Sequence, residues 1–256
     1  MEQVETSLGG DGPFRLQPLP ILLVVLMGLG IPVLSAITIY IVEHFVHLFE
    51  RPQMPWIAEA YVEVVQFAYA LLAIRYMQRI YPGDYGLKLP EGKTYVLDAI
   101  LWGLFFGVLM TVVDFWPQLL AQRPPASNVY APTAYNMTGW LSFEGLIAGT
   151  SEETLFRGLL VTYLANAMPG RLSFRGYEMS GAGVVVAALF ALAHIGNFFL
   201  RPFAMAFGQL VYAFALGVLY AYWYEKSRSL LAPVIGHNVG NFVEQALIFA
   251  MVIAWS

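Results

Sequence analysis

Two adjacent carboxylates and an arginine, Glu152, Glu153 and Arg157, lie inside a long apolar stretch that runs from about Tyr135 to Ala167. Ionisable groups at membrane depth cost roughly 2.5–3.5 kcal/mol each, so they persist where they have a partner or a task. Glu153 and Arg157 are four residues apart, which is the favourable spacing for an ion pair on a helix. Glu152 is turned about 100° away from Glu153. We therefore expect Arg157 to neutralise Glu153, while Glu152 faces a cavity as the working carboxylate.

Other polar groups interrupt the apolar background further along the chain. Phe190 is followed four residues later by His194, and His237, Asn241 and Glu244 recur at helical spacing. The last three side chains would share one helix face. Asn241 and Glu244 can also be interpreted as groups that bridge helices.

These residue types limit the chemistry that the cluster can perform. A carboxylate and a histidine can together hold a water molecule and remove its proton. A histidine N–H and an asparagine amide can donate hydrogen bonds to the oxygen that becomes negative when this water attacks a carbonyl. The combination predicts hydrolysis of an amide or ester without a covalent intermediate.

The composition indicates that a membrane bundle positions these groups. Of the 256 residues, 59% are hydrophobic and only 12% are charged, whereas a soluble domain carries about 25% charged residues. The net charge of −4 and the lack of a basic run argue against a nucleic-acid partner. The absence of cysteine excludes disulfides, thiolate zinc sites and a cysteine nucleophile.

The apolar runs predict an all-α, polytopic bundle of about seven to eight transmembrane helices, with the active site inside the membrane. A polar and mobile N-terminal tail (1–18) precedes one multi-pass domain (19–256), whose core motifs lie in 140–256. Gly236 and Gly240 could split the last helix into two. The predicted spans are about 19–41, 56–80, 94–119, 135–167, 181–199, 202–224 and 230–256.

Three smaller features of the spans also carry predictions. Gly103 and Gly107 form a small-xxx-small pair suited to close helix contact. Asp98 and Asp114 lie near the two ends of their span, and we interpret both as interface positions. Residues 169–180 are predicted to form a loop, and 225–228 a short turn.

The distribution of lysine and arginine predicts the orientation. Nine of these residues fall in the tail and loops on the N-terminal side, and three fall on the other side. The excess favours a cytoplasmic N-terminus. The first span lacks the features of a cleaved signal peptide. We expect an integral protein of the inner or plasma membrane, or of the endoplasmic reticulum in a eukaryote.

Taken in order, Glu152-Glu153-xxx-Arg157, Phe190-xxx-His194 and His237-xxx-Asn241 resemble the CPBP family of intramembrane proteases. That family includes the CAAX prenyl proteases of the Rce1 type and the bacterial ABI proteins. The resemblance extends from about Leu87 to the C-terminus. Each motif is short, but the ordered set in a membrane protein is specific.

The resemblance implies a role for each residue. Glu152 and His194 would activate the nucleophilic water, and His237 and Asn241 would form the oxyanion site. Glu153, Arg157 and Phe190 would support them. The substrate would be a membrane-bound peptide or protein, which is prenylated in the CAAX branch of the family.

Other readings of the same residues remain open. The family has also been described as metalloproteases, in which case Glu152, His194 and His237 would hold zinc. We favour metal-free chemistry with no cofactor, because no His-Glu-xx-His motif is present. A serine mechanism through Ser151 and an aspartyl mechanism fit poorly.

The main alternative is a protein without enzymatic activity, either a proton-coupled transporter or an immunity-type binding protein. Buried glutamate and histidine suit a proton relay equally well. Such a transporter would more often have two symmetric halves with broken helices, and the sequence shows none.

Overall fold

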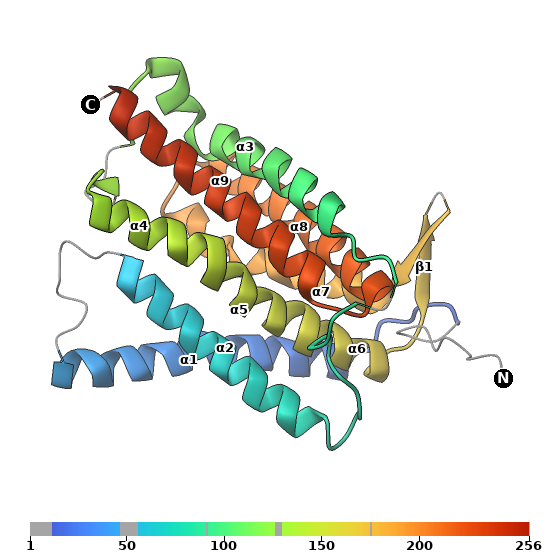
Figure 1. Ribbon diagram of the computed structural model, residues 1–256. Coiled ribbons are helices and arrows are strands. Elements are labelled where there is room, and N and C mark those ends of the chain that lie inside the picture. The colour runs from blue at the N-terminus through green and yellow to red at the C-terminus, as the bar shows by residue number, and fades with distance from the viewer. Residues whose placement is uncertain (1–11, 47–55, 91, 126–129, 175, 256) are drawn as a thin grey trace.

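The computed structural model describes residues 12–46, 56–90, 92–125, 130–174 and 176–255. It is a bundle of long helices with one small β-hairpin, as Figure 1 shows, and the predicted all-α membrane bundle is confirmed. The helices are α1 (Pro18–Val46), α2 (Trp56–Met77), α3 (Val96–Ala121), α4 (Ala134–Ser142), η2 (Phe143–Ala148), α5 (Gly149–Glu153), η3 (Thr154–Val161), α6 (Thr162–Ala167), α7 (Gly181–Ala193), η4 (Ile195–Phe199), α8 (Phe203–Ser227) and α9 (Leu231–Trp255).

Six of the helical segments are long and apolar enough to cross a membrane: 18–44, 56–77, 96–121, 181–199, 203–227 and 231–255. The run from α4 to α6 is one continuous helical segment, in which α-helix alternates with the wider π-helix of η2 and η3. It corresponds to the predicted span that carries Glu152, and it packs between α2 and α9.

Helix α9 makes its most extensive contact with α3, and the two run side by side in Figure 1. A Cβ at Gly103 would lie 2.8 Å from the backbone oxygen of Gly236, and a Cβ at Gly107 would lie 2.7 Å from that of Gly240. The predicted role of the glycine pair in α3 is thus confirmed. The expected split of α9 is wrong: Gly236 and Gly240 serve close packing inside one continuous helix.

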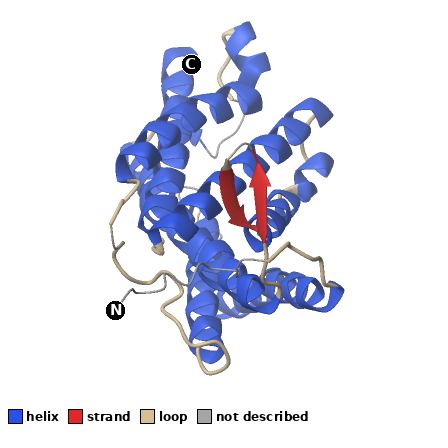
Figure 2. Cartoon of the chain, turned by 90° about the vertical axis from the view of Figure 1, so that its right-hand side faces the viewer, coloured by secondary structure: helices blue, strands red, loops and turns tan. Residues whose placement is uncertain are grey.

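The loop predicted for 169–180 contains an antiparallel hairpin, β1 (Arg171–Phe174) and β2 (Tyr177–Ser180), drawn in red in Figure 2. The described end of the N-terminal tail is held against the hairpin, contrary to the prediction of a mobile tail. The Arg171 N–H donates to the oxygen of Gly12 over 3.0 Å. A Cβ at Gly181 would lie 2.1 Å from the ring of Phe14. Residues 1–11 of the predicted tail lie outside the described part.

The predicted turn at 225–228 is also wrong, because α8 continues to Ser227. The reason is that Glu225 has a buried partner: its carboxylate accepts hydrogen bonds from the backbone N–H and the hydroxyl of Ser180. Ser180 is the N-cap of α7 and accepts from the Gly183 N–H. Glu225 therefore fixes the beginning of the helix that carries Phe190.

The two aspartates of α3 differ in environment. Asp98 forms an ion pair with Lys93 over 3.1 Å, and both side chains are well exposed, as an interface position requires. Asp114 is not an interface residue, because it is buried. Its Oδ2 accepts from Arg201 and from the Tyr212 hydroxyl, each over 3.0 Å. These partners lie almost a hundred residues away in the sequence, so local spacing did not reveal them.

The described N-terminal segment, the hairpin and the α2–α3 loop gather at the same end of the bundle (Figure 1). Backbone contacts agree, since the Leu230 N–H donates to the oxygen of Gly86 and thereby joins the α2–α3 loop to the α8–α9 turn. The segments predicted to be cytoplasmic therefore share one face. That this face meets the cytoplasm stays a prediction.

Candidate active site

The segment α5, between the π-helices η2 and η3, carries Glu152 and Glu153. π-helical turns are rare and occur frequently at functional sites. Gly149, at the start of α5, allows α9 to approach closely, because a Cβ there would lie 2.7 Å from the Cβ of His237. The Gly149 N–H donates to Oδ1 of Asn238 over 2.9 Å. The first turn of α5 is therefore joined directly to α9.

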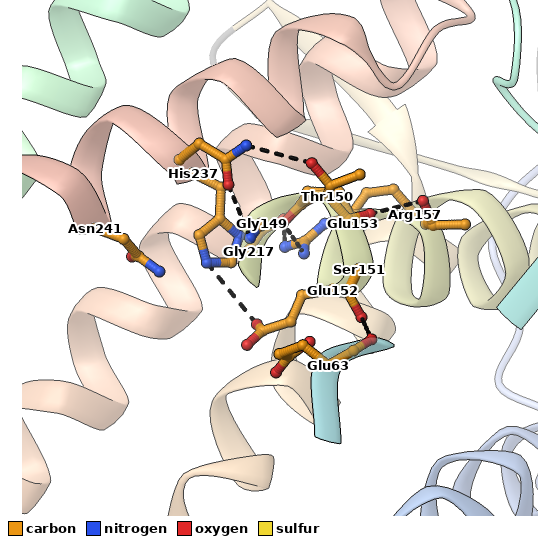
Figure 3. Close-up of polar contacts among 12 residues, drawn as sticks. Glu63, Gly149, Thr150, Ser151, Glu152, Glu153, Arg157, Gly217, His237 and Asn241 are labelled. Carbon is orange, nitrogen blue, oxygen red and sulfur yellow. Dashed lines mark hydrogen bonds and ion pairs between the residues drawn. The ribbon is translucent and has the colours of Figure 1, made fainter. Parts of the chain in front are cut away.

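The predicted ion pair is present. Arg157 Nη1 donates to Glu153 Oε1 over 2.8 Å, and both side chains are fully buried. Arg157 Nη2 also donates to the oxygen of Gly217 on α8 over 3.2 Å. The same Glu153 oxygen lies 2.8 Å from Nδ1 of His237 (Figure 3). Arg157, Glu153 and His237 thus form a connected chain of charges and hydrogen bonds across η3, α5 and α9.

A polar cavity of about 170 Å³ lies in front of this chain. All four predicted catalytic residues, Glu152, His194, His237 and Asn241, line it, and Phe190 lines it as well. Glu153 and Arg157 are buried behind it. A water molecule needs about 10–15 Å³ of such space, so the cavity has room for water and for part of a substrate.

The two histidines present different geometries. Nδ1 of His194 lies 3.0 Å from the backbone oxygen of Phe190. A carbonyl oxygen can only accept, so Nδ1 carries the proton, and Nε2 of the neutral ring is an acceptor. Nε2 of His237 lies 3.9 Å from Oε2 of Glu152 (Figure 3). Glu152 keeps 22% of its side chain exposed, in contrast to the fully buried Glu153.

Aromatic rings hold His237 and Arg157 in place. The ring of Tyr220 stacks on His237 at 5.6 Å between centroids, and Phe190 meets His237 edge-on at 6.0 Å. The Arg157 guanidinium lies 4.7 Å from the centre of the Phe190 ring. Phe190 also contacts the ring of His194 at 5.4 Å. Phe190 therefore contacts both histidines and the arginine.

Sequence reasoning missed four polar residues that line the cavity: Glu144, Gln209, Tyr212 and Tyr220. Glu144 Oε2 accepts a hydrogen bond from Nδ2 of Asn241 over 3.0 Å. A glutamate at membrane depth is itself a signal, so Glu144 could have been found by the argument that identified Glu152. Gln209 and the two tyrosines are uncharged residues scattered in an apolar span, and they gave no such signal.

The placement of the possible ligands bears on the zinc alternative. Among the described residues, no three histidine or carboxylate side chains converge on one point where they could hold a metal ion. Nδ1 of His237 is engaged by Glu153, which leaves Nε2 facing Glu152 at 3.9 Å. As placed, Glu152, His194 and His237 do not form such a three-ligand group, and the absence of a cofactor stays a prediction.

Comparison with known proteins gives one result. The family model described as Type II CAAX prenyl endopeptidase Rce1-like matches residues 135–243. That range begins at the start of α4 and contains every predicted site residue. No curated protein and no solved structure matches the chain.

Proposed function

The chain belongs to the Rce1-like family of CAAX prenyl endopeptidases, and from this premise we propose that it cleaves a peptide bond inside the membrane by metal-free hydrolysis. Family membership and the apolar helices make it an integral membrane protein of an intramembrane endopeptidase family. The proposal adds the residues, the mechanism and the substrate.

In the proposed reaction, Glu152 and His194 hold one water molecule in the cavity. As the water oxygen attacks the carbonyl carbon, its proton passes to the Glu152 carboxylate. The tetrahedral intermediate then collapses, the C–N bond breaks, and Glu152 returns the proton to the leaving nitrogen. The products are a carboxylic acid and an amine, and Glu152 ends as it began.

The hydrogen bonds of the two histidines support this division of roles. His194 donates through Nδ1 to Phe190, so its Nε2 can accept a hydrogen bond from the water. His237 directs Nδ1 at the Glu153 carboxylate, which can only accept while Arg157 holds it ionised. When Nε2 of His237 is also protonated, it donates into the cavity together with the Asn241 amide, and both can stabilise the oxyanion.

One observation carries the proposal: a single cavity is lined by Glu152, His194, His237 and Asn241, which come from three separate parts of the chain. For the substrate we propose a membrane-anchored peptide or protein with a prenylated C-terminal segment. The family membership supports this substrate class, and the cavity lies among helices apolar enough to cross a membrane.

Quantitative analysis of peptide termini in host membranes tests the proposal. Cells would carry either the wild-type chain or Glu152→Gln at equal abundance. We expect new peptide termini in membrane proteins only in cells that carry the wild type. Some of these termini should belong to proteins that have a prenylated C-terminal segment. Identical termini, together with any biological effect retained by Glu152→Gln, would contradict hydrolysis and favour a transport or binding role.

A further inference from the structure

We infer that Glu144 is a positioning residue that orients the Asn241 amide toward the oxyanion. The inference rests on the proposed function and deepens it. It concerns a carboxylate that the reaction steps above do not use.

The contact itself fixes which end of the amide faces Glu144. Glu144 Oε2 accepts from Nδ2 of Asn241 over 3.0 Å, and both residues line the cavity. An ionised carboxylate has acceptors only, whereas an amide has two N–H groups at one end and an oxygen at the other. The NH₂ end of Asn241 is therefore held toward Glu144.

The second N–H of that NH₂ group can then donate a hydrogen bond to a group inside the cavity. Without Glu144 the side-chain amide could rotate by half a turn, and its Oδ1 would then face the substrate oxygen as that oxygen becomes negative. An acceptor in that position repels the developing charge that a donor should stabilise. Glu144 thus determines whether Asn241 assists or opposes the reaction.

The π-helical turn explains how Glu144 reaches this position. In a regular α-helix, Glu144 would be rotated by about 80° from Glu152, because the two are eight residues apart. The intervening η2 segment takes more residues per turn and so reduces that rotation. The result is that Glu144 and Glu152 line one cavity.

The hydrogen bond could instead serve only to join η2 to α9. The two roles predict different kinetics. A purely structural bond would change the amount of folded protein, whereas an orienting bond changes kcat of the folded protein and needs Asn241 to do so.

The test measures kcat and KM on a membrane-anchored fluorogenic peptide with purified protein in liposomes. Glu144→Met removes the acceptor at similar length, and Glu144→Gln retains an acceptor oxygen. We expect Glu144→Met to lower kcat by about 10- to 100-fold with little change in KM, since removing an oxyanion donor outright costs about 10²–10³. Glu144→Gln should restore most of that loss. In an Asn241→Ala background, Glu144→Met should cause little further loss.

The matched control is Glu59→Met, which removes an exposed carboxylate of α2 outside the cavity lining. It should leave kcat unchanged. The inference alone is overturned if the wild type is active and Glu144→Met is equally active. It is also overturned if the loss of kcat caused by Glu144→Met fully multiplies with the loss caused by Asn241→Ala. A folded but inactive Glu144→Gln also overturns it, because the carboxyl group itself would then be needed. A wild type that cleaves no substrate overturns the proposed function and this inference together.

Discussion

Two arginine–carboxylate pairs among the described residues, Glu153–Arg157 and Asp114–Arg201, differ in how they are built. Glu153 and Arg157 lie one helical turn apart and are both fully buried. Asp114 and Arg201 join α3 to the segment before α8, and Arg201 keeps 35% of its side chain exposed. The first pair holds His237 through Glu153. The Asp114–Arg201 pair fixes the segment that follows His194 and η4. Asp114 also accepts a hydrogen bond from Tyr212, which lines the cavity.

The difference shows what each pair contributes. A pair with both partners buried leaves an uncompensated charge when either partner is removed. A pair with one partly exposed partner is asymmetric, because that partner can turn to water when its companion is lost. We therefore expect Glu153–Arg157 to be essential for both folding and catalysis, and Asp114–Arg201 to act mainly on stability.

The largest effect is expected from Arg157→Met. It leaves Glu153 buried without its counter-ion, so the free energy of unfolding should fall by about 3–5 kcal/mol. Hydrolysis should be lost as well, because Glu153, which holds Nδ1 of His237, loses the Arg157 hydrogen bond that fixes it. Unfolding in mixed micelles, followed by tryptophan fluorescence, measures the first effect. The double variant Glu153→Gln with Arg157→Met should be less destabilised than the sum of the single variants, and strict additivity would contradict a coupled pair.

A smaller and asymmetric effect is expected from the second pair. Arg201→Met should lower the free energy of unfolding by about 2–3 kcal/mol, because it leaves the Asp114 carboxylate buried with fewer hydrogen bonds. Asp114→Asn should cost roughly 1 kcal/mol, because Arg201 can turn outward and be solvated. The same unfolding measurement compares them. Equal costs, or a larger cost for Asp114→Asn, would disagree with the exposure of Arg201.

The contact between α3 and α9 links the two pairs, since α3 carries Asp114 and α9 carries His237. Gly107→Ala should lower the free energy of unfolding by about 1–2 kcal/mol, because the new Cβ would overlap α9; it would lie 2.6 Å from the Cβ of Val243. Gly28→Ala is the control, since no atom lies within 4 Å of a Cβ there. Similar results for the two variants would indicate that the helix contact is looser than described.

The smallest effect is expected from Tyr220→Phe. The stacking of the ring on His237 is retained, and no hydrogen bond of the Tyr220 hydroxyl occurs among the described residues. The free energy of unfolding should change by less than about 0.5 kcal/mol, and kcat should change by less than about threefold. A larger loss of kcat, with normal stability, would give the Tyr220 hydroxyl a place in the reaction.

The two pairs also show why part of the molecule could be predicted from the sequence. Glu153 and Arg157 are neighbours on one helix, so their spacing alone identified them. Asp114 and Arg201 are far apart in the chain, and only the packed bundle brings them together. Long apolar runs predicted the helices well, because crossing a bilayer imposes their length.

The errors have equally local causes. Glu144 was overlooked because the membrane-depth argument was applied only to the adjacent pair Glu152 and Glu153, and the π-helical turn of η2, which brings Glu144 to the cavity, is not visible in the sequence. The turn predicted at 225–228 overlooked the buried contact between Glu225 and Ser180, which retains that segment in α8. Gly236 was interpreted as a break in the helix, but a Cβ there would lie 2.9 Å from the ring of Trp223. For Glu225 and Gly236, a tertiary contact overrode the local signal.

The most direct test of the central claim is cleavage of a membrane-anchored peptide by purified protein in liposomes, with Glu152→Gln compared to Glu59→Gln. Both substitutions remove one carboxylate, but only Glu152 lines the cavity with His194 and His237. We predict that Glu59→Gln cleaves as the wild type does and that Glu152→Gln, folded to the same extent, cleaves at least about 10³-fold more slowly. Equal cleavage by the wild type and Glu152→Gln would contradict the assignment of Glu152 as the group that activates water.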